Sequence, residues 1–372
     1  MSRSELLDVA PVGPAEYAEI EDLCGEVLGT SQTTLVVQGE ATVFLEAAAR
    51  GLGRPGGRAL NLVSGPYGAV FGEWLAEAGS EVKDLVVPFD RAVQPEEVEE
   101  ALATYGPFDV VSLVHAEAAN GVVNNLPAIA RLARSRGALV VVDAVAAVGA
   151  EPLAIENWGL DLVVLSAQKA LAGPAGVSMI TVSPSAWAAL AAHPSPRRDS
   201  VLSLLDWRDR WSGAGRSVLP VIPAHLETRA LGAAMARVQA EGLDRVVARH
   251  RAAARATRAA LAPLGLEPWA RQSGEAASVA TVVRAPSEGA AALVQAALAA
   301  AEDLLAPLST APGSLATEAL RVNHTGKRAT LPSVWSALAA LARGLGTLGH
   351  DTDLPAALAI STSTWYATAE GP

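Results

Sequence analysis

Short apolar runs alternate with segments of helical pattern along most of the chain. Each run is rich in Val, Leu and Ile and has the length of about 4–8 residues that fits a buried strand. The runs are residues 34–37, 59–63, 82–87, 109–114, 138–142, 160–165 and 177–182. Between them, segments such as QPEEVEEALATYG begin with proline and acidic residues and end at glycine, which is typical of a helix. This α/β alternation predicts βαβ units, and therefore a mainly parallel sheet with helices on both faces.

The same pattern divides the chain into two α/β domains and a tail. The large domain, with a short helical segment at its N-terminal end, is predicted to cover residues 1–237. From EGLDRVVARHRAAARATRAALAPLG onward we expect two strands and three helices, which make a smaller C-terminal α/β domain over residues 238–348. Residues 349–372 show no clear period, and we expect this tail to be poorly ordered.

Composition and charge argue against several classes of protein. The chain has 372 residues, 51% of them hydrophobic, but no run of about 18 uninterrupted apolar residues, so we expect no membrane span. The single cysteine, Cys24, excludes an intramolecular disulfide, and the six histidines form no H-E-x-x-H pattern, so we expect no metal site. A net charge of −11 disfavours nucleic acid as a partner. The start of the chain lacks the pattern of a signal peptide, and we predict a cytoplasmic protein.

Polar residues follow two of the predicted strands directly. In an open parallel sheet, ligands bind outside the carboxyl ends of the strands. Asp143 follows one apolar run, and Ser166, Gln168 and Lys169 follow the next. We therefore expect Asp143 and Lys169 in one crevice, either as a plain ion pair or as the two groups that hold pyridoxal phosphate (PLP). A buried lysine suits the second role, because burial lowers the pKa of its amine and only the neutral amine attacks an aldehyde.

Two further segments fit a bound pyridoxal ring and its phosphate. Tyr67, in SGPYGAV, is placed to stack on the ring. A strand that ends at Gln38 leads into a helix near Ala41 and Thr42, and the N-terminus of that helix would offer backbone N–H groups to a phosphate. The sequence thus supplies candidates for each part of a PLP site.

At these residues the sequence resembles the class V aminotransferases of PLP fold type I, most closely the alanine–glyoxylate and serine–pyruvate branch. The matching segments are VVDAVAAVGAEP, NWGLDLVVLSAQKAL and GPAG. The resemblance implies a PLP-dependent aminotransferase that moves an amino group between a small, alanine- or serine-like amino acid and a glyoxylate- or pyruvate-like 2-oxo acid. It also implies a homodimer with active sites at the subunit interface.

The resemblance assigns roles to individual residues. Lys169 is expected to form the Schiff base with the cofactor, Asp143 to contact the ring nitrogen, and Arg321, in ALRVNHTGKRAT, to bind the substrate carboxylate. Glu117, in HAEAANGVVNNL, fits either a group behind the cofactor or a helix-capping acid. The other expected cofactor contacts are Gln168, Ser166, Tyr67, Glu40, Ala41, Thr42, Val145 and Arg216.

Three segments depart from the family pattern. The phosphate turn reads QGEAT, with Glu40 where the family has a hydroxyl, so Glu40 is expected to point away from a phosphate or to weaken its binding. The segment AGRSVLPVIP lacks two side chains that reach the phosphate across the dimer interface, and Arg216 is the expected substitute. The family's N-terminal G-P-G segment has no counterpart. These departures leave two alternatives open: a PLP-dependent lyase, aldolase or biosynthetic enzyme, and a non-catalytic protein of the same fold.

Overall fold

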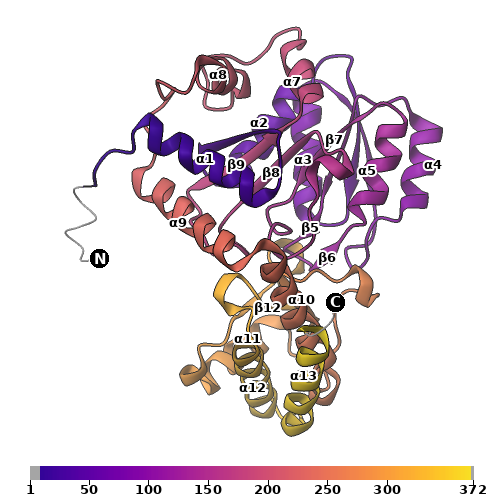
Figure 1. Ribbon diagram of the computed structural model, residues 1–372. Coiled ribbons are helices and arrows are strands. Elements are labelled where there is room, and N and C mark those ends of the chain that lie inside the picture. The colour runs from indigo at the N-terminus through magenta and orange to yellow at the C-terminus, as the bar shows by residue number, and fades with distance from the viewer. Residues whose placement is uncertain (1–8, 370–372) are drawn as a thin grey trace.

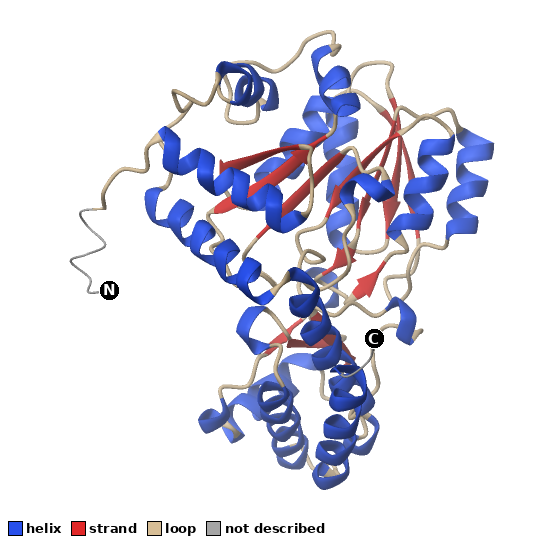
Figure 2. Ribbon diagram, in the orientation of Figure 1, coloured by secondary structure: helices blue, strands red, loops and turns tan. Residues whose placement is uncertain are grey.

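A seven-stranded sheet forms the centre of the large domain (Figure 2). The computed structural model describes residues 9–369. The strand order is β1-β9-β8-β7-β4-β2-β3. The strands are β1 (Thr33–Gln38), β2 (Arg58–Val63), β3 (Glu81–Val86), β4 (Val110–Val114), β7 (Leu139–Asp143), β8 (Leu162–Ser166) and β9 (Val177–Val182). Strand β9 runs antiparallel to β1 and β8 and the other pairs are parallel, which confirms the mainly parallel sheet.

Helices pack on both sides of this sheet (Figure 1). They are α1 (Pro14–Leu28), α2 (Ala41–Leu52), α3 (Pro66–Glu77), α4 (Pro95–Tyr105), α5 (Leu126–Ser135), α6 (Ile155–Trp158), α7 (Pro184–Ala191), α8 (Leu204–Arg210) and α9 (His225–Glu241). Helices α2 and α3 lie side by side, α2 against β8 and β9 and α3 against β2, β3 and β4. Helices α1 and α9 pack together beside β1 and β9. The central strands β4, β8 and β9 are buried along their whole length, which explains why their sequences are continuous apolar runs.

The small domain has its own sheet and its own apolar core. Its three antiparallel strands have the order β10-β12-β11 and are β10 (Ala280–Arg284), β11 (Leu308–Thr310) and β12 (Ala319–Asn323). Its helices are α10 (Leu243–Ala259), α11 (Ala290–Ala300), α12 (Leu331–Thr347) and α13 (Leu354–Ala369). A two-stranded ribbon, β5 (Ala116–Glu117) with β6 (Val122–Val123), follows β4 of the large domain. Compared with the sequence prediction, the small domain has one additional strand, β11, and one additional helix, α13.

The prediction of a poorly ordered tail is wrong for residues 354–369. They form helix α13, which packs against α10 and α12. Ala357 is fully buried, and Leu354, Leu358 and Trp365 pack against the core of the small domain. Ser361 and Thr362 interrupt the apolar pattern, so the sequence did not indicate a helix here. In the structure their hydroxyls donate to the backbone carbonyl of Leu358 within the helix. The remaining residues of the predicted tail, 370–372, lie outside the described residues.

The chain passes between the domains at a glycine. The sequence placed the boundary between residues 237 and 238, but helix α9 continues to Glu241. Gly242 follows with φ 89°, a left-handed conformation that glycine adopts without strain, and α10 starts at the next residue. Since α9 packs on the large domain and α10 on the small one, we propose Gly242 as the boundary.

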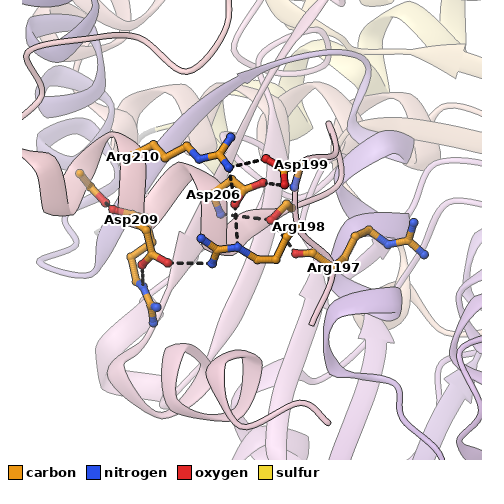
Figure 3. Close-up of polar contacts among 9 residues, drawn as sticks. Arg197, Arg198, Asp199, Asp206, Asp209 and Arg210 are labelled. Atoms are coloured by element: carbon orange, nitrogen blue, oxygen red, sulfur yellow. Dashed lines mark hydrogen bonds and ion pairs between the residues drawn. The ribbon is translucent and has the colours of Figure 1, made fainter. Parts of the chain in front are cut away.

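A network of ion pairs fixes the segment before α8 (Figure 3). Arg198 forms an ion pair with Asp206, with its Nε 2.9 Å from a carboxylate oxygen, and its Nη1 donates to Asp209 at 2.7 Å. Asp206 is buried and also accepts the backbone N–H of Asp199, while Ser203 caps the helix by accepting from the backbone of Asp206. Helix α8 packs against α2, so this network supports the helix whose N-terminus reaches the candidate active site.

Candidate active site

One cavity lies at the carboxyl ends of β7 and β8, where the sequence placed its polar residues. Asp143 ends β7 and pairs in register with Val164 of β8, and Lys169 follows β8 by three residues. The N-termini of α2 and α3 face the same cavity. It is lined by Glu40, Ala41, Thr42, Leu45, Tyr67, Val114, Ala116, Ala118, Asp143, Val145, Ala146, Gln168 and Lys169. The fold thus gathers most of the expected site residues from four separate segments of the chain.

Asp143 contributes a buried carboxyl group to this cavity. One of its oxygens accepts the backbone N–H of Val145 at 2.9 Å. Burial raises the pKa of Asp143 to about 6, and the nearby charge of Glu40 adds to this, while the Val145 N–H and Lys169 oppose it. A buried carboxylate of this kind is stabilised by a cationic N–H donor such as a protonated ring nitrogen.

Lys169 has the environment of a reactive amine. Burial and the charge of Arg321 lower its pKa, while Glu40 and Asp143 oppose the shift. Among residues 9–369, no carboxylate lies within 4.0 Å of its amine, so the plain ion pair with Asp143 does not form. A lowered pKa increases the fraction of neutral amine, which is the nucleophilic form.

Glu40 points into the site and not away from it. It is the N-cap of α2, where its Oε2 accepts the backbone N–H of Thr42 at 2.8 Å and also the Thr42 hydroxyl. Its Oε1 accepts from Nε2 of Gln168 at 2.8 Å. Burial opposes ionisation of Glu40, but these hydrogen bonds outweigh it and lower the pKa of the carboxyl group. The first of the two expectations for Glu40, that its side chain turns away, is therefore wrong.

Tyr67 lies in the first turn of α3, and Glu117, on β5, contacts the backbone of the same turn. Tyr67 lines the cavity and is 46% exposed, so its ring is free to contact a ligand. Glu117 is fully buried and accepts the backbone N–H of Gly68 at 3.1 Å, which is the helix-capping role. A Cβ at Gly65 would lie 2.4 Å from Cδ of Glu117, so only glycine fits there. Burial raises the pKa of Glu117 to about 8, so a neutral carboxyl group supports the turn that carries Tyr67.

Arg321 lies beside the cavity on β12 of the small domain. Its Nη1 donates to the carbonyl of Ala118 at 3.0 Å and its Nη2 to the hydroxyl of Ser309 at 3.3 Å. Within the described part of the chain, no carboxylate is within ion-pair distance of its guanidinium, and its buried Nε has no partner. Asn323 also donates to Ser309 and holds this hydroxyl in place. Ser309 was not predicted from the sequence, because the short strand β11 gave no pattern, and Asn323, on the predicted strand β12, was assigned no role.

Two expected cofactor contacts lie away from the cavity lining. Ser166 is fully buried at the end of β8, and its hydroxyl has no partner among residues 9–369. Arg216 pairs with Asp22 at 2.5 Å and lies 3.8 Å from Glu21, both on helix α1. In this arrangement Arg216 contributes no contact to the cavity of its own chain. The apolar wall formed by Leu45, Val114, Ala116 and Ala146 was not predicted.

The fold and the site define a PLP-dependent aminotransferase. The family model described as "Aminotransferase class-V" matches residues 14–300, and the chain belongs to this family. Pyridoxamine–pyruvate transaminase of Mesorhizobium japonicum is 33% identical over 286 residues, which are 77% of this chain and 72% of that protein. The crystal structure of pyridoxamine–pyruvate aminotransferase from Mesorhizobium loti is similar with a TM-score of 0.88 and 30% identity, over 95% of this chain and 90% of that chain. Alanine–glyoxylate aminotransferase from Nostoc sp. has a TM-score of 0.83 and 26% identity, over 92% of each chain.

The residues fit one end of the family's cofactor, PLP, better than the other. Lys169, Asp143 and Tyr67 line the cavity and would offer an amine to the aldehyde, an acid to the ring nitrogen and an aromatic face to the ring. The phosphate end does not fit in the same way, because the carboxylate of Glu40 occupies the N-terminus of α2. Among residues 9–369, no cluster of His, Cys, Asp and Glu suits a metal ion. No helix in this part of the chain is long and apolar enough to cross a membrane.

Proposed function

We propose that this aminotransferase acts on a small 2-oxo acid of the pyruvate or glyoxylate type and that Lys169 forms its Schiff base. The observation that carries the proposal is the placement of Lys169 and Asp143 in one cavity without an ion pair between them. The aminotransferase activity itself follows from the family and from its named relatives. An alanine- or serine-like amino acid is the first candidate donor.

Each group in the cavity has a distinct task in amino transfer. PLP, when bound, supplies an aldehyde and a ring that withdraws electrons. Lys169, as a neutral amine, is suited to take the proton from the α-carbon of the substrate at Nζ. Asp143 is suited to hold the proton on the ring nitrogen, and Arg321 to bind the substrate carboxylate through its two terminal nitrogens.

Pyridoxamine is the second candidate donor. The relatives from Mesorhizobium are named for transfer between pyridoxamine and pyruvate. The position of Glu40 favours this donor, because a carboxylate at the phosphate end suits a ligand without a phosphate. Both donors use the same Lys169 and Asp143.

An amino-transfer assay tests the proposal. The purified protein is incubated with pyruvate or glyoxylate and with alanine, serine or pyridoxamine, and the new amino acid is measured by chromatography. We expect alanine or glycine to form with at least one donor. Products of Cα–Cβ cleavage would instead favour the lyase or aldolase alternative. The absence of any reaction in a protein that also stays colourless with pyridoxal and PLP would favour the non-catalytic one.

Replacing Arg321 should weaken binding of the oxo acid. Arg321→Gln removes a charged hydrogen-bond donor, so we expect KM for pyruvate to rise by about 10-fold with a smaller change in kcat. Steady-state kinetics measure both constants. Arg343→Gln is the matched control, because Arg343 pairs with Asp303 on the outside of the small domain. An unchanged KM in Arg321→Gln would show that another group binds the carboxylate.

A homodimer is supported by an apolar segment ahead of α9. Val218, Val221 and Ile222 are 70%, 41% and 83% exposed, which is unusual for three apolar side chains so close together. We expect Ile222→Asp to shift the molar mass measured by light scattering from that of a dimer toward that of a monomer. Val86→Asp, at an exposed valine of the edge strand β3, should leave the mass unchanged. A wild-type protein with the mass of a monomer would contradict the proposal. A cytoplasmic location stays a prediction from the sequence.

A further inference from the structure

The N-terminus of α2 is built as an anion site. The helix has 12 residues, and its first turn lines the cavity at Ala41 and Thr42. Free N–H groups and the helix dipole at such a position favour a negative charge, and this is where many proteins bind phosphate. The question is which anion the site receives in this chain.

The side chain of Glu40 already provides that anion. Its carboxylate accepts the backbone N–H and the hydroxyl of Thr42 on one oxygen and Nε2 of Gln168 on the other. Thr42 and Gln168 both line the cavity, and these donors are engaged by Glu40. Within the described residues, no lysine or arginine lies within 4.0 Å of Glu40 to neutralise it. This end of the cavity therefore carries a negative charge that has no contact ion pair and is exposed to a ligand.

A phosphate and a hydroxyl group would interact differently with the negative charge of Glu40. A phosphate would be repelled by the carboxylate and would find the helix donors occupied. A hydroxymethyl group is neutral, and its O–H can donate a hydrogen bond to a carboxylate oxygen. Pyridoxal and pyridoxamine carry this hydroxymethyl group where PLP carries its phosphate ester.

We infer that Glu40 is a specificity residue that makes this site prefer the unphosphorylated pyridoxal and pyridoxamine over the phosphorylated forms. The inference rests on the proposed function, since it assumes that Lys169 and Asp143 hold the ring. Without a phosphate to anchor it, the ring exchanges with solvent and acts as a substrate. The reaction is then pyridoxamine plus 2-oxo acid giving pyridoxal plus amino acid. The C=O bond of the oxo acid breaks with release of one water as a C–N bond forms at that carbon, and the C–N bond of pyridoxamine breaks with uptake of one water to give the aldehyde. The former keto carbon gains the two electrons that the pyridoxamine carbon loses, so no outside oxidant is required.

Absorbance titration tests this inference without measuring activity. Pyridoxal and PLP are each added to the purified protein, and the visible band of the ring bound to Lys169 gives a Kd for each. We expect the wild-type protein to bind pyridoxal more tightly than PLP. Glu40→Ser and Glu40→Gln both remove the charge, and each should shift the ratio of the two Kd values toward PLP by about 10-fold or more. Glu40→Gln keeps an oxygen that can accept from Thr42, so it controls for loss of the helix cap.

The control is another charge removal on the same helix. Glu46→Gln breaks the ion pair of Glu46 with Arg50 on α2, outside the cavity lining, and should leave the Kd ratio unchanged. Tighter binding of PLP than of pyridoxal by the wild-type protein, or an unchanged ratio in both Glu40 variants, would overturn the inference and leave the proposed function standing. A wild-type protein that gives no band with either compound would overturn both.

Discussion

Lys169→Ala should abolish the visible absorbance band of the bound ring and reduce amino transfer by about 1,000-fold or more. The variant removes both the amine that bonds to the aldehyde and the base that moves the α-proton. Because Lys169 has no ion pair within residues 9–369, its loss leaves no carboxylate without a partner, and the fold should remain intact. Absorbance titration and the pyruvate assay measure the two effects, and circular dichroism checks the fold.

The small number of lysines makes this test sharp. The chain has three, Lys83, Lys169 and Lys327. Reduction of the ligand-bound protein with borohydride fixes the ring to its lysine, and peptide mass spectrometry then identifies the site. Lys83 is on β3, where its amine lies over the ring of Tyr105. Lys83→Ala is therefore the matched control and should keep the band and the activity. A label on Lys83 or Lys327, or a band that survives in Lys169→Ala, would refute the assignment.

Asp143→Ala should separate ring attachment from turnover. We expect the absorbance band to persist, because Lys169 is intact, while kcat falls by about 100-fold. The physical reason is the loss of a hydrogen bond from a charged ring nitrogen, which lets the ring lose the proton that makes it electron-withdrawing. Single-turnover kinetics with pyruvate measure the fall in rate.

A second variant at this position distinguishes charge from shape. Asp143→Asn keeps the size of the side chain and an oxygen that can accept the Val145 N–H, but it removes the negative charge. Since the pKa of Asp143 is raised to about 6, wild-type Asp143 loses its charge as the pH falls through that value. Ring binding in the wild type should therefore weaken below about pH 6 more steeply than in Asp143→Asn. Equal pH profiles, or full turnover in either variant, would mean that the ring nitrogen has another partner.

Strand ends were predictable because their sequence signal is local. The apolar runs before Asp143 and Lys169 are buried strands, and a parallel sheet must bring their carboxyl ends to one edge. Helix α13 shows the limit of such signals. Its apolar side chains are interspersed with serine and threonine, so only the packing against α10 revealed that the segment is helical.

Glu40 and Arg216 show that the sequence does not predict the direction of a side chain or its distant partners. Both positions were recognisable in the sequence as departures from the family pattern. The direction of each side chain depends on partners that are far away in the chain: Gln168 for Glu40, and Asp22 for Arg216. Hydrogen bonds and ion pairs between distant segments form only after the sheet has assembled, so no local pattern encodes them.

The sequence by itself determined the alternating α/β architecture, the two strand-end residues Asp143 and Lys169, and the likeness to an aminotransferase family. It could do so because periodicity and strand-end placement are properties of neighbouring residues. The tertiary structure alone decided that Lys169 and Asp143 are not an ion pair, that Arg321 of the small domain lies beside the cavity and donates to Ala118, and that the carboxylate of Glu40 caps the N-terminus of α2. These outcomes depend on burial and on contacts across the fold, which fix the charge and the direction of each side chain.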